Sequence, residues 1–170
     1  MKIIYAIAAA AVVATPMAAS AQSVDGLRFG LELGLQDGSS NATGDDELYG
    51  AFVGYDANLG AGVIGGELVF RDSDLTASNG TVLNDTIQLK ARYGQEIGGG
   101  LLYGTIGLAR ASASTGGTDN GYLVGVGYEY GLTDQVFLGG ELQYSEFQNV
   151  GATNADVGST SIAVRLGYKF

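Results

Sequence analysis

Ten charged side chains recur at alternate positions of stretches that otherwise alternate between polar and apolar residues. A charge in a low-dielectric interior is costly unless a charge of opposite sign neutralises it. We therefore expect ion pairs inside the fold, with Arg165 beside Glu32 and Glu141, and Glu67 beside Lys90 or Arg92. The predicted charge network consists of Arg28, Glu32, Asp56, Glu67, Arg71, Lys90, Arg92, Glu129, Glu141 and Arg165, and Lys169 shares their alternation.

The composition excludes several kinds of chemistry. The 170 residues include no His and no Cys, which excludes disulfides, Cys or His zinc sites, and nucleophiles activated by an imidazole. Glu67 and Glu141 could form an acid–base pair of carboxylates, but basic neighbours would hold both ionised. We expect no catalytic residue, no cofactor and no metal site, and hence no enzyme. A formal net charge of −10 argues against nucleic acid as a partner, because phosphate binding needs Lys and Arg.

Residues 1–21 have the pattern of a secretory signal peptide. A basic residue precedes an apolar run, Pro16 ends the run, and Ala19-Ser20-Ala21 supplies the small residues that come before a cleavage site. We expect cleavage between Ala21 and Gln22, which leaves residues 22–170 as one barrel domain. A transmembrane anchor is the alternative, because the apolar segment is nearly long enough to cross a bilayer. The central proline and the lack of a basic cluster after the segment disfavour an anchor.

Eight stretches alternate with a period of two, which predicts strands with one polar and one apolar face. In the fifth stretch, Leu102, Ile106 and Leu108 favour one register and Tyr103 favours the other, so its register stays open. Short connections that contain Gly alternate with longer polar ones, which predicts an up-and-down antiparallel meander. The stretches are 27–36, 49–57, 64–71, 86–94, 101–110, 122–130, 136–145 and 161–170; the short connections are 58–62, 95–100 and 131–135; the longer ones are 37–47, 72–85, 111–120 and 146–158.

The two faces differ in a way that separates a membrane barrel from a soluble one. The polar face holds mainly Gly, Ala and Ser with one or two charges per strand, as the narrow interior of a barrel requires. Aromatic residues on the apolar face gather in two belts, which bilayer interfaces favour. One belt contains Tyr55, Tyr93, Tyr128, Tyr130, Tyr168 and Phe170, and the other contains Tyr49, Phe70, Tyr122 and Tyr144. These features predict an all-β fold, an eight-stranded antiparallel up-and-down transmembrane β-barrel.

A family resemblance adds to this interpretation. The terminal run from Ile162 to Phe170, the Ala-x-Ala leader and the Gly-Glu-Leu strand fragments resemble small Gram-negative outer-membrane β-barrels. The most similar types are the membrane domain of outer-membrane protein A and the opacity-protein-like barrels of the porin family. The resemblance implies residence in the bacterial outer membrane and contact with membrane lipid and lipopolysaccharide. It also implies that Tyr168 and Phe170 form a C-terminal signal read by the barrel assembly machinery.

Two functions fit such a barrel. The favoured interpretation is a structural and surface-interaction protein whose lumen is filled by ion pairs, because side chains can fill the space that eight strands enclose. Its acidic longer connections would then face the exterior, toward an unidentified host or cell-surface ligand. The alternative is a small diffusion pore for ions or small solutes, gated by rearrangement of the ion pairs. The Gly-lined polar face disfavours a soluble lipocalin-like carrier.

Carboxylates and one Arg mark the longer connections. Asp45-Asp46-Glu47 and Asp72-Ser73-Asp74 could hold Ca²⁺ or Mg²⁺ through hard oxygen ligands. Neither fits a full calcium-loop pattern, so a solvated acidic surface is the favoured interpretation. Arg110 would face a lipopolysaccharide phosphate if it points outward, which the open register of its strand leaves undecided.

Overall fold

The described part of the chain is built of β-strands. The computed structural model describes residues 25–39, 42–43, 45–77, 82–113, 118–150 and 155–170, so the predicted signal peptide and its cleavage junction lie outside the described residues. Within these ranges no helix is long and apolar enough to cross a membrane. The strands are β1 (Gly26–Ser39), β2 (Ala42–Thr43), β3 (Asp45–Asn58), β4 (Val63–Ala77), β5 (Val82–Ile97), β6 (Gly100–Ala113), β7 (Thr118–Gly131), β8 (Val136–Val150) and β9 (Ala155–Lys169).

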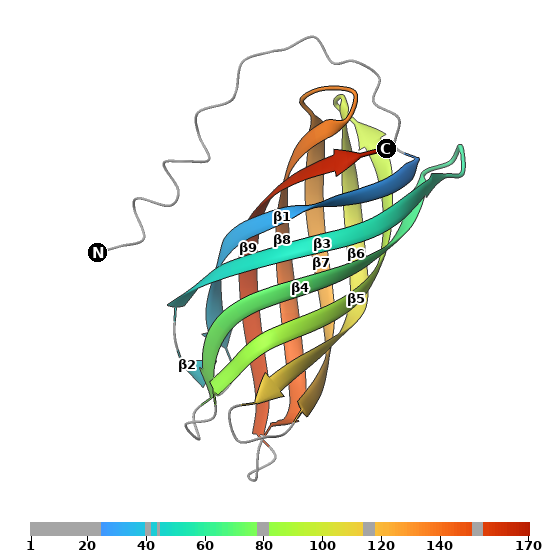
Figure 1. Cartoon of the computed structure of the whole chain (residues 1–170). Helices are drawn as coiled ribbons and strands as arrows, with labels where there is room; N and C mark the ends of the chain where they lie inside the picture. Colours follow the sequence, from blue (N-terminus) through green and yellow to red (C-terminus); the bar gives the residue numbers. More distant parts are fainter. Residues whose placement is uncertain (1–24, 40–41, 44, 78–81, 114–117, 151–154) are drawn as a thin grey trace.

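The eight long strands close into a barrel (Figure 1). Each pairs antiparallel with its neighbours along the chain, and β1 also pairs with β9, so no long strand described here keeps an unpaired edge. The two-residue β2 pairs with the end of β4. Residues 59–62, 98–99 and 132–135 make the short turns. We call the end of the barrel with these turns the turn end and the opposite end the loop end. The predicted eight-stranded antiparallel up-and-down β-barrel is confirmed.

The long strands extend beyond the predicted alternating stretches. They are 14 to 16 residues long. For example, β4 continues to Ala77 and β5 begins at Val82, so most of the predicted connection 72–85 is β-ladder. The register shifts between Asp72 and Leu75, where the ladder leaves its regular course. Backbone hydrogen bonding continues outside the apolar band, where the alternation of hydropathy no longer marks a strand.

Strand β6 places Leu102, Ile106 and Leu108 on the outer face and Tyr103 on the inner face, which resolves the register left open by the sequence. Ile106 and Leu108 are 66% and 67% exposed, whereas Tyr103 is 1% exposed inside the barrel. The ring of Tyr103 finds room there because Gly127, directly opposite on β7, has no side chain. Arg110 has the same alternation as Leu108 and therefore points outward.

Strands β1 and β9 meet along a seam that closes the barrel. The N–H of Phe170 donates to the C=O of Leu27 at 3.0 Å. On the outer face, the ring centroid of Phe29 lies 5.9 Å from that of Tyr168 and 5.8 Å from that of Phe170. Phe29, which the predicted belts do not include, thus joins the belt residues Tyr168 and Phe170 in a seam cluster of three rings that connects the first long strand to the last.

Candidate functional site: the charge network in the lumen

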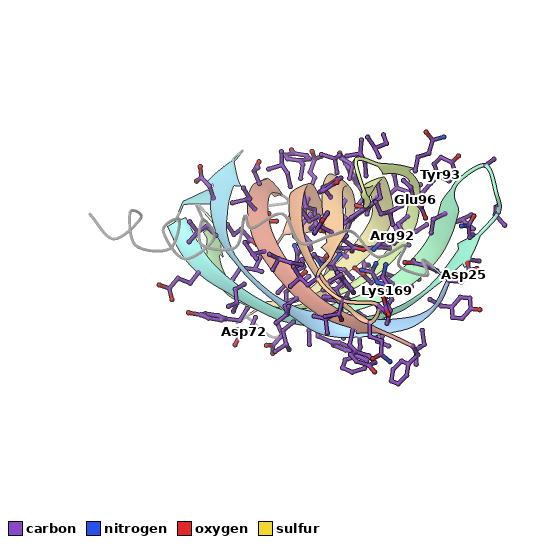
Figure 2. All side chains as sticks on the ribbon, turned by 90° about the horizontal axis from the view of Figure 1, so that it is seen from above. Asp25, Asp72, Arg92, Tyr93, Glu96 and Lys169 are labelled. Atoms are coloured by element: carbon purple, nitrogen blue, oxygen red, sulfur yellow. The ribbon has the colours of Figure 1, made fainter. Side chains whose placement is uncertain are left out.

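The predicted charge network lies inside the barrel. All ten of its residues, and Lys169 with them, are at most 4% exposed. The alternation of each strand aims these side chains inward because the opposite face carries the apolar residues. Figure 2 shows Arg92 and Lys169 within the ring of strands, while Asp72 and Tyr93 lie outside it. Bases and acids in nearly equal number thus share one buried space.

Arg165 on β9 is the centre of the network. Its Nη2 lies 2.6 Å from Oε1 of Glu67 on β4, a strand that does not adjoin β9 in the barrel. Its Nη1 lies 3.1 Å from Oε2 of Glu141 on β8, and its Nε lies 3.3 Å from Oε2 of Glu32 on β1. One fully buried guanidinium therefore connects three walls of the barrel, and one of its contacts crosses the lumen.

Glu129 on β7 holds two guanidinium groups. Arg28 of β1 approaches it with Nη1 2.9 Å from Oε2 and Nη2 2.9 Å from Oε1. Arg92 of β5 donates to the same carboxylate from Nη1 at 2.9 Å and from Nη2 at 3.1 Å. Both contacts have the two-point geometry that makes Arg–carboxylate pairs strong. Arg28 also lies 3.2 Å from Asp56 and 2.7 Å from Glu67, so the network links β1, β3, β4, β5 and β7.

Two further bases reach the same carboxylates from β4 and β5. Lys90 Nζ lies 2.5 Å from Oε1 of Glu141. Arg71 donates through Nε to Glu32 and through Nη1 to Ser161 Oγ at 3.3 Å. Each acid of the network therefore has a base within ion-pair distance. The arrangement is suited to holding the walls of the barrel together.

Glu67 has the partners expected from the sequence, but they are not its closest ones. Lys90 and Arg92 of the adjacent strand β5 lie 4.0 Å and 3.9 Å from this carboxylate. Its closer partners are Arg165 at 2.6 Å and Arg28 at 2.7 Å. The reason is the length of the Arg side chain, which reaches across a narrow lumen to strands that do not adjoin its own.

Four aromatic rings that the predicted network does not include also lie in the lumen; Phe147 is nearer the loop end, and the other three pack among the charges. Each of these three is at most 3% exposed, and each lies against the Gly directly opposite on a neighbouring strand. A Cβ added at any of these three Gly positions would overlap the ring. The signal that could reveal such rings is an inward Gly paired with an inward aromatic residue, which requires the register between strands. The pairs are Phe52 with Gly30, Tyr103 with Gly127, and Phe137 with Gly167.

The inward rings also contact the cations of the network. The guanidinium of Arg165 lies 3.9 Å from the ring centroid of Phe52, and that of Arg92 lies 3.9 Å from the ring centroid of Tyr103. Cation–π contacts of this kind contribute about 0.5–2 kcal/mol. The hydroxyl of Tyr103 donates to Glu141 at 3.1 Å and accepts from Arg165 at 3.2 Å. Tyr103 is thus a full member of the network, although it carries no charge.

The loop-end half of the lumen has a different character. Its walls carry uncharged residues, both small ones such as Ala111 and Ser159 and large apolar ones, namely Leu48, Leu123 and Phe147. Near mid-depth, Gln88 Oε1, Thr105 Oγ1 and Gln143 Oε1 are buried without a hydrogen-bond partner among the described residues. Buried polar atoms of this kind are normally satisfied by water. The lumen therefore combines a densely ion-paired part with a hydratable part nearer the loop end.

The acidic residues at the loop end do not gather into a metal site in the part of the chain that the structure describes. No three acidic side chains there are placed to hold an ion together. The side chains of Asp45, Asp46 and Asp74, which belong to the two clusters singled out in the sequence, lie outside the described residues. The described exposed carboxylates on the outer side of the strand ends are Asp37, Glu47, Asp72 and Asp85.

Asp72 and Asp85 form a pair of like charges on the outer face. They lie directly opposite each other on β4 and β5, and both are exposed. We expect the substitution Asp85→Asn to raise the free energy of unfolding by about 0.2–1 kcal/mol, because like charges in this arrangement destabilise a sheet. Salt should reduce the gain by screening the repulsion. Urea unfolding in lipid vesicles at low and high salt tests this, with Asp134→Asn in a turn as the control; a gain equal at both salt concentrations contradicts it.

A closed antiparallel barrel that is apolar outside and ion-paired inside defines an integral outer-membrane β-barrel protein. Residues 6–170 match the family described as the outer membrane protein beta-barrel domain, and the chain belongs to that family. This membership and the fold indicate an outer-membrane location. No curated protein matches the chain.

Solved structures include several similar barrels. Neisserial surface protein A is 19% identical, with a TM-score of 0.59 over 85% of this chain and 97% of that one. A de novo designed transmembrane β-barrel is 8% identical, with a TM-score of 0.49 over 88% of this chain and 99% of that one. The outer-membrane protein OmpT of Vibrio cholerae is 18% identical, with a TM-score of 0.32 over 72% of this chain and 43% of that one. The similarity to Neisserial surface protein A shows a shared fold.

Proposed function

We propose that this protein is a structural, non-conducting barrel of the Gram-negative outer membrane. The observation that carries the proposal is the set of ion pairs that cross the lumen, above all Arg165 with Glu67 and Arg28 with Glu129. A solute could pass only if several buried charges lost their partners together. Removing one partner of a buried pair typically costs about 3–5 kcal/mol, which supports a lumen that stays closed.

The other parts of the proposal concern the ends of the barrel. The leader, residues 1–21, would direct export, and Tyr168 with Phe170 would be read by the barrel assembly machinery. The exposed carboxylates at the loop end would present an acidic surface to a host or cell-surface ligand. We propose no enzymatic activity, because Glu67 and Glu141 are both bound by bases of the network.

Single-channel recording in a planar bilayer tests the closed lumen. We expect the refolded wild-type protein to give no stable unitary current steps, because the ion pairs leave no continuous aqueous path. Insertion is verified separately by the shift in gel mobility between heated and unheated samples, so that silence cannot reflect absent protein. Steps of defined size that change when Glu141 is replaced by Gln would overturn the proposal.

The alternative function, a small diffusion pore, is favoured by one observation. The loop-end half of the lumen has uncharged walls, and buried oxygens near mid-depth lack a hydrogen-bond partner among the described residues, which water would supply. Only the ion-paired part would then have to rearrange for ions to pass. The same recording distinguishes the two functions, since a pore gives steps and a plugged barrel gives none.

A further inference from the structure

Arg110 is the one basic side chain that the described barrel presents on its outer surface. The sequence contains eight Lys and Arg residues. Lys2 belongs to the predicted leader, and six others are buried in the lumen: Arg28, Arg71, Lys90, Arg92, Arg165 and Lys169. Arg110 is exposed and points outward from β6. A positive charge on the lipid-facing side of a barrel is tolerated near the interface and costly at the bilayer midplane, so its position along the strand matters.

Arg110 lies at the level of the lipid headgroups on the loop side. Tyr122, a member of the aromatic belt at the loop end, is directly opposite Leu108. Arg110 is two residues farther toward the loop end on the same strand, which corresponds to about 7 Å. Aromatic belts mark the boundary between hydrocarbon and headgroups. The guanidinium therefore stands just beyond the apolar band, where anionic headgroups are found.

A groove on the outer surface connects Arg110 with the apolar band. The large side chains that line it are aliphatic and exposed: Ile87 is 48%, Leu89 61% and Leu108 67% exposed. The polar residues of the groove, Arg110 and Asn120, lie directly opposite each other on β6 and β7. The groove thus has the two parts that an anionic lipid requires, an apolar surface for an acyl chain and a basic group at one end. Its lining consists of Ile87, Leu89, Leu108, Ala109, Arg110, Asn120 and Gly121.

We propose that this groove binds one molecule of lipopolysaccharide, with an acyl chain of the lipid A part along the groove and a phosphate on Arg110. Charge complementarity favours a phosphate, because a guanidinium binds its oxygens through paired N–H donors. The longer loops of outer-membrane barrels face the exterior, so the headgroups at the level of Arg110 belong to the lipopolysaccharide leaflet. The site does not depend on whether the lumen conducts.

Native mass spectrometry of the detergent-refolded mature barrel tests the site. The probes are purified bisphosphorylated lipid A, the same lipid without its phosphates, and phosphatidylglycerol. We expect wild type to retain one molecule of bisphosphorylated lipid A more tightly than either of the other lipids. Arg110→Gln should weaken this binding about tenfold or more, because a charge-assisted hydrogen bond is lost. Arg110→Lys should weaken the binding less than Arg110→Gln does, because the charge remains although the paired N–H donors are lost.

A matched pair of substitutions tests the apolar part of the groove. Leu108→Ala should weaken lipid A binding, because it removes acyl-chain contact. Leu33→Ala is the control, because Leu33 is 59% exposed on β1, across the barrel from the groove. Like Leu108, Leu33 is paired with an outward Tyr on the next strand, here Tyr49. Each variant is first checked for the folded gel mobility. Equal affinity of wild type and Arg110→Gln overturns the site, and equal affinity for lipid A and phosphatidylglycerol overturns the choice of lipopolysaccharide as its occupant.

Discussion

Replacing Arg165 by Ala is expected to lower the free energy of unfolding by about 3–5 kcal/mol, the usual cost of removing one partner of a buried ion pair. The substitution leaves the carboxylates of Glu67, Glu141 and Glu32 without the base that all three share. It also removes the cation from the face of the Phe52 ring. The urea midpoint in lipid vesicles should fall, and the folded species on an unheated gel should lose intensity.

Two further variants test whether the effect of Arg165→Ala comes from the lost ion pairs. Adding Glu67→Gln should recover part of the loss, because it removes one of the carboxylates that the first substitution left unbalanced. Asp134→Asn removes a charge from an exposed turn, so it should leave the midpoint close to that of wild type. If Arg165→Ala unfolds at the wild-type urea concentration and keeps its heat-dependent gel shift, the ion-paired plug is wrong.

Replacing Gly167 by Ala is expected to destabilise the barrel by about 1–3 kcal/mol, the range for overpacking a filled interior. The added Cβ would overlap the ring of Phe137, which is fully buried. That ring has little room to retreat, because Arg28 and Lys169 each lie 5.0 Å from its centroid and the ring of Phe52 lies 6.2 Å away. Urea unfolding in vesicles measures the loss.

Gly140→Ala is the matched control for Gly167→Ala. Gly140 faces outward from β8, and the nearest atom to an added Cβ is the carbonyl oxygen of Ala163 at 3.9 Å. This substitution should be neutral or slightly stabilising, because it lowers the entropy of the unfolded chain without a clash. Combining Gly167→Ala with Phe137→Leu should recover much of the stability lost by Gly167→Ala alone. Equal losses for Gly140→Ala and Gly167→Ala contradict the ring-on-glycine packing.

The fold could be predicted because a strand repeats every two residues and the two faces have different compositions. The lengths of the strands could not, since Asp72 and its neighbours continue the ladder without apolar alternation. The register of β6 was ambiguous for a physical reason. Tyr103 is large and mostly apolar, so its type alone does not distinguish a belt residue from a lumen residue. Its position is determined by the space over Gly127, which becomes visible only when β6 and β7 are paired.

The membership of the charge network follows from the alternation of single strands, and the contacts of Arg165 with Glu32 and Glu141 follow from the order of adjacent strands. The contacts that cross the lumen do not follow from either. The alternation indicates that Arg28 and Glu129 both point inward. Their contact joins β1 and β7, which are not neighbours, and it depends on the tilt of the strands and on the reach of a guanidinium. Short-range rules connect residues on adjacent strands. They account for the contacts of Glu67 with Lys90 and Arg92 of β5. They miss its closer contacts with Arg28 and Arg165, because the lumen is narrow enough for long side chains to cross it.

The seam between β1 and β9 is the pairing that we expect to limit the rate of folding. Every other pair of long strands joins neighbours along the chain and can form as a local hairpin, whereas the seam must bring Phe29 to Tyr168. Closing such a long loop lowers the entropy of the chain before the stabilising contacts form. Non-local pairing of this kind therefore slows folding. Until closure, β1 and β9 keep exposed edges that can pair with other chains and aggregate. We therefore expect that slower closure of the barrel lowers the yield of folded protein. Substitutions in the seam cluster should change the rate of closure.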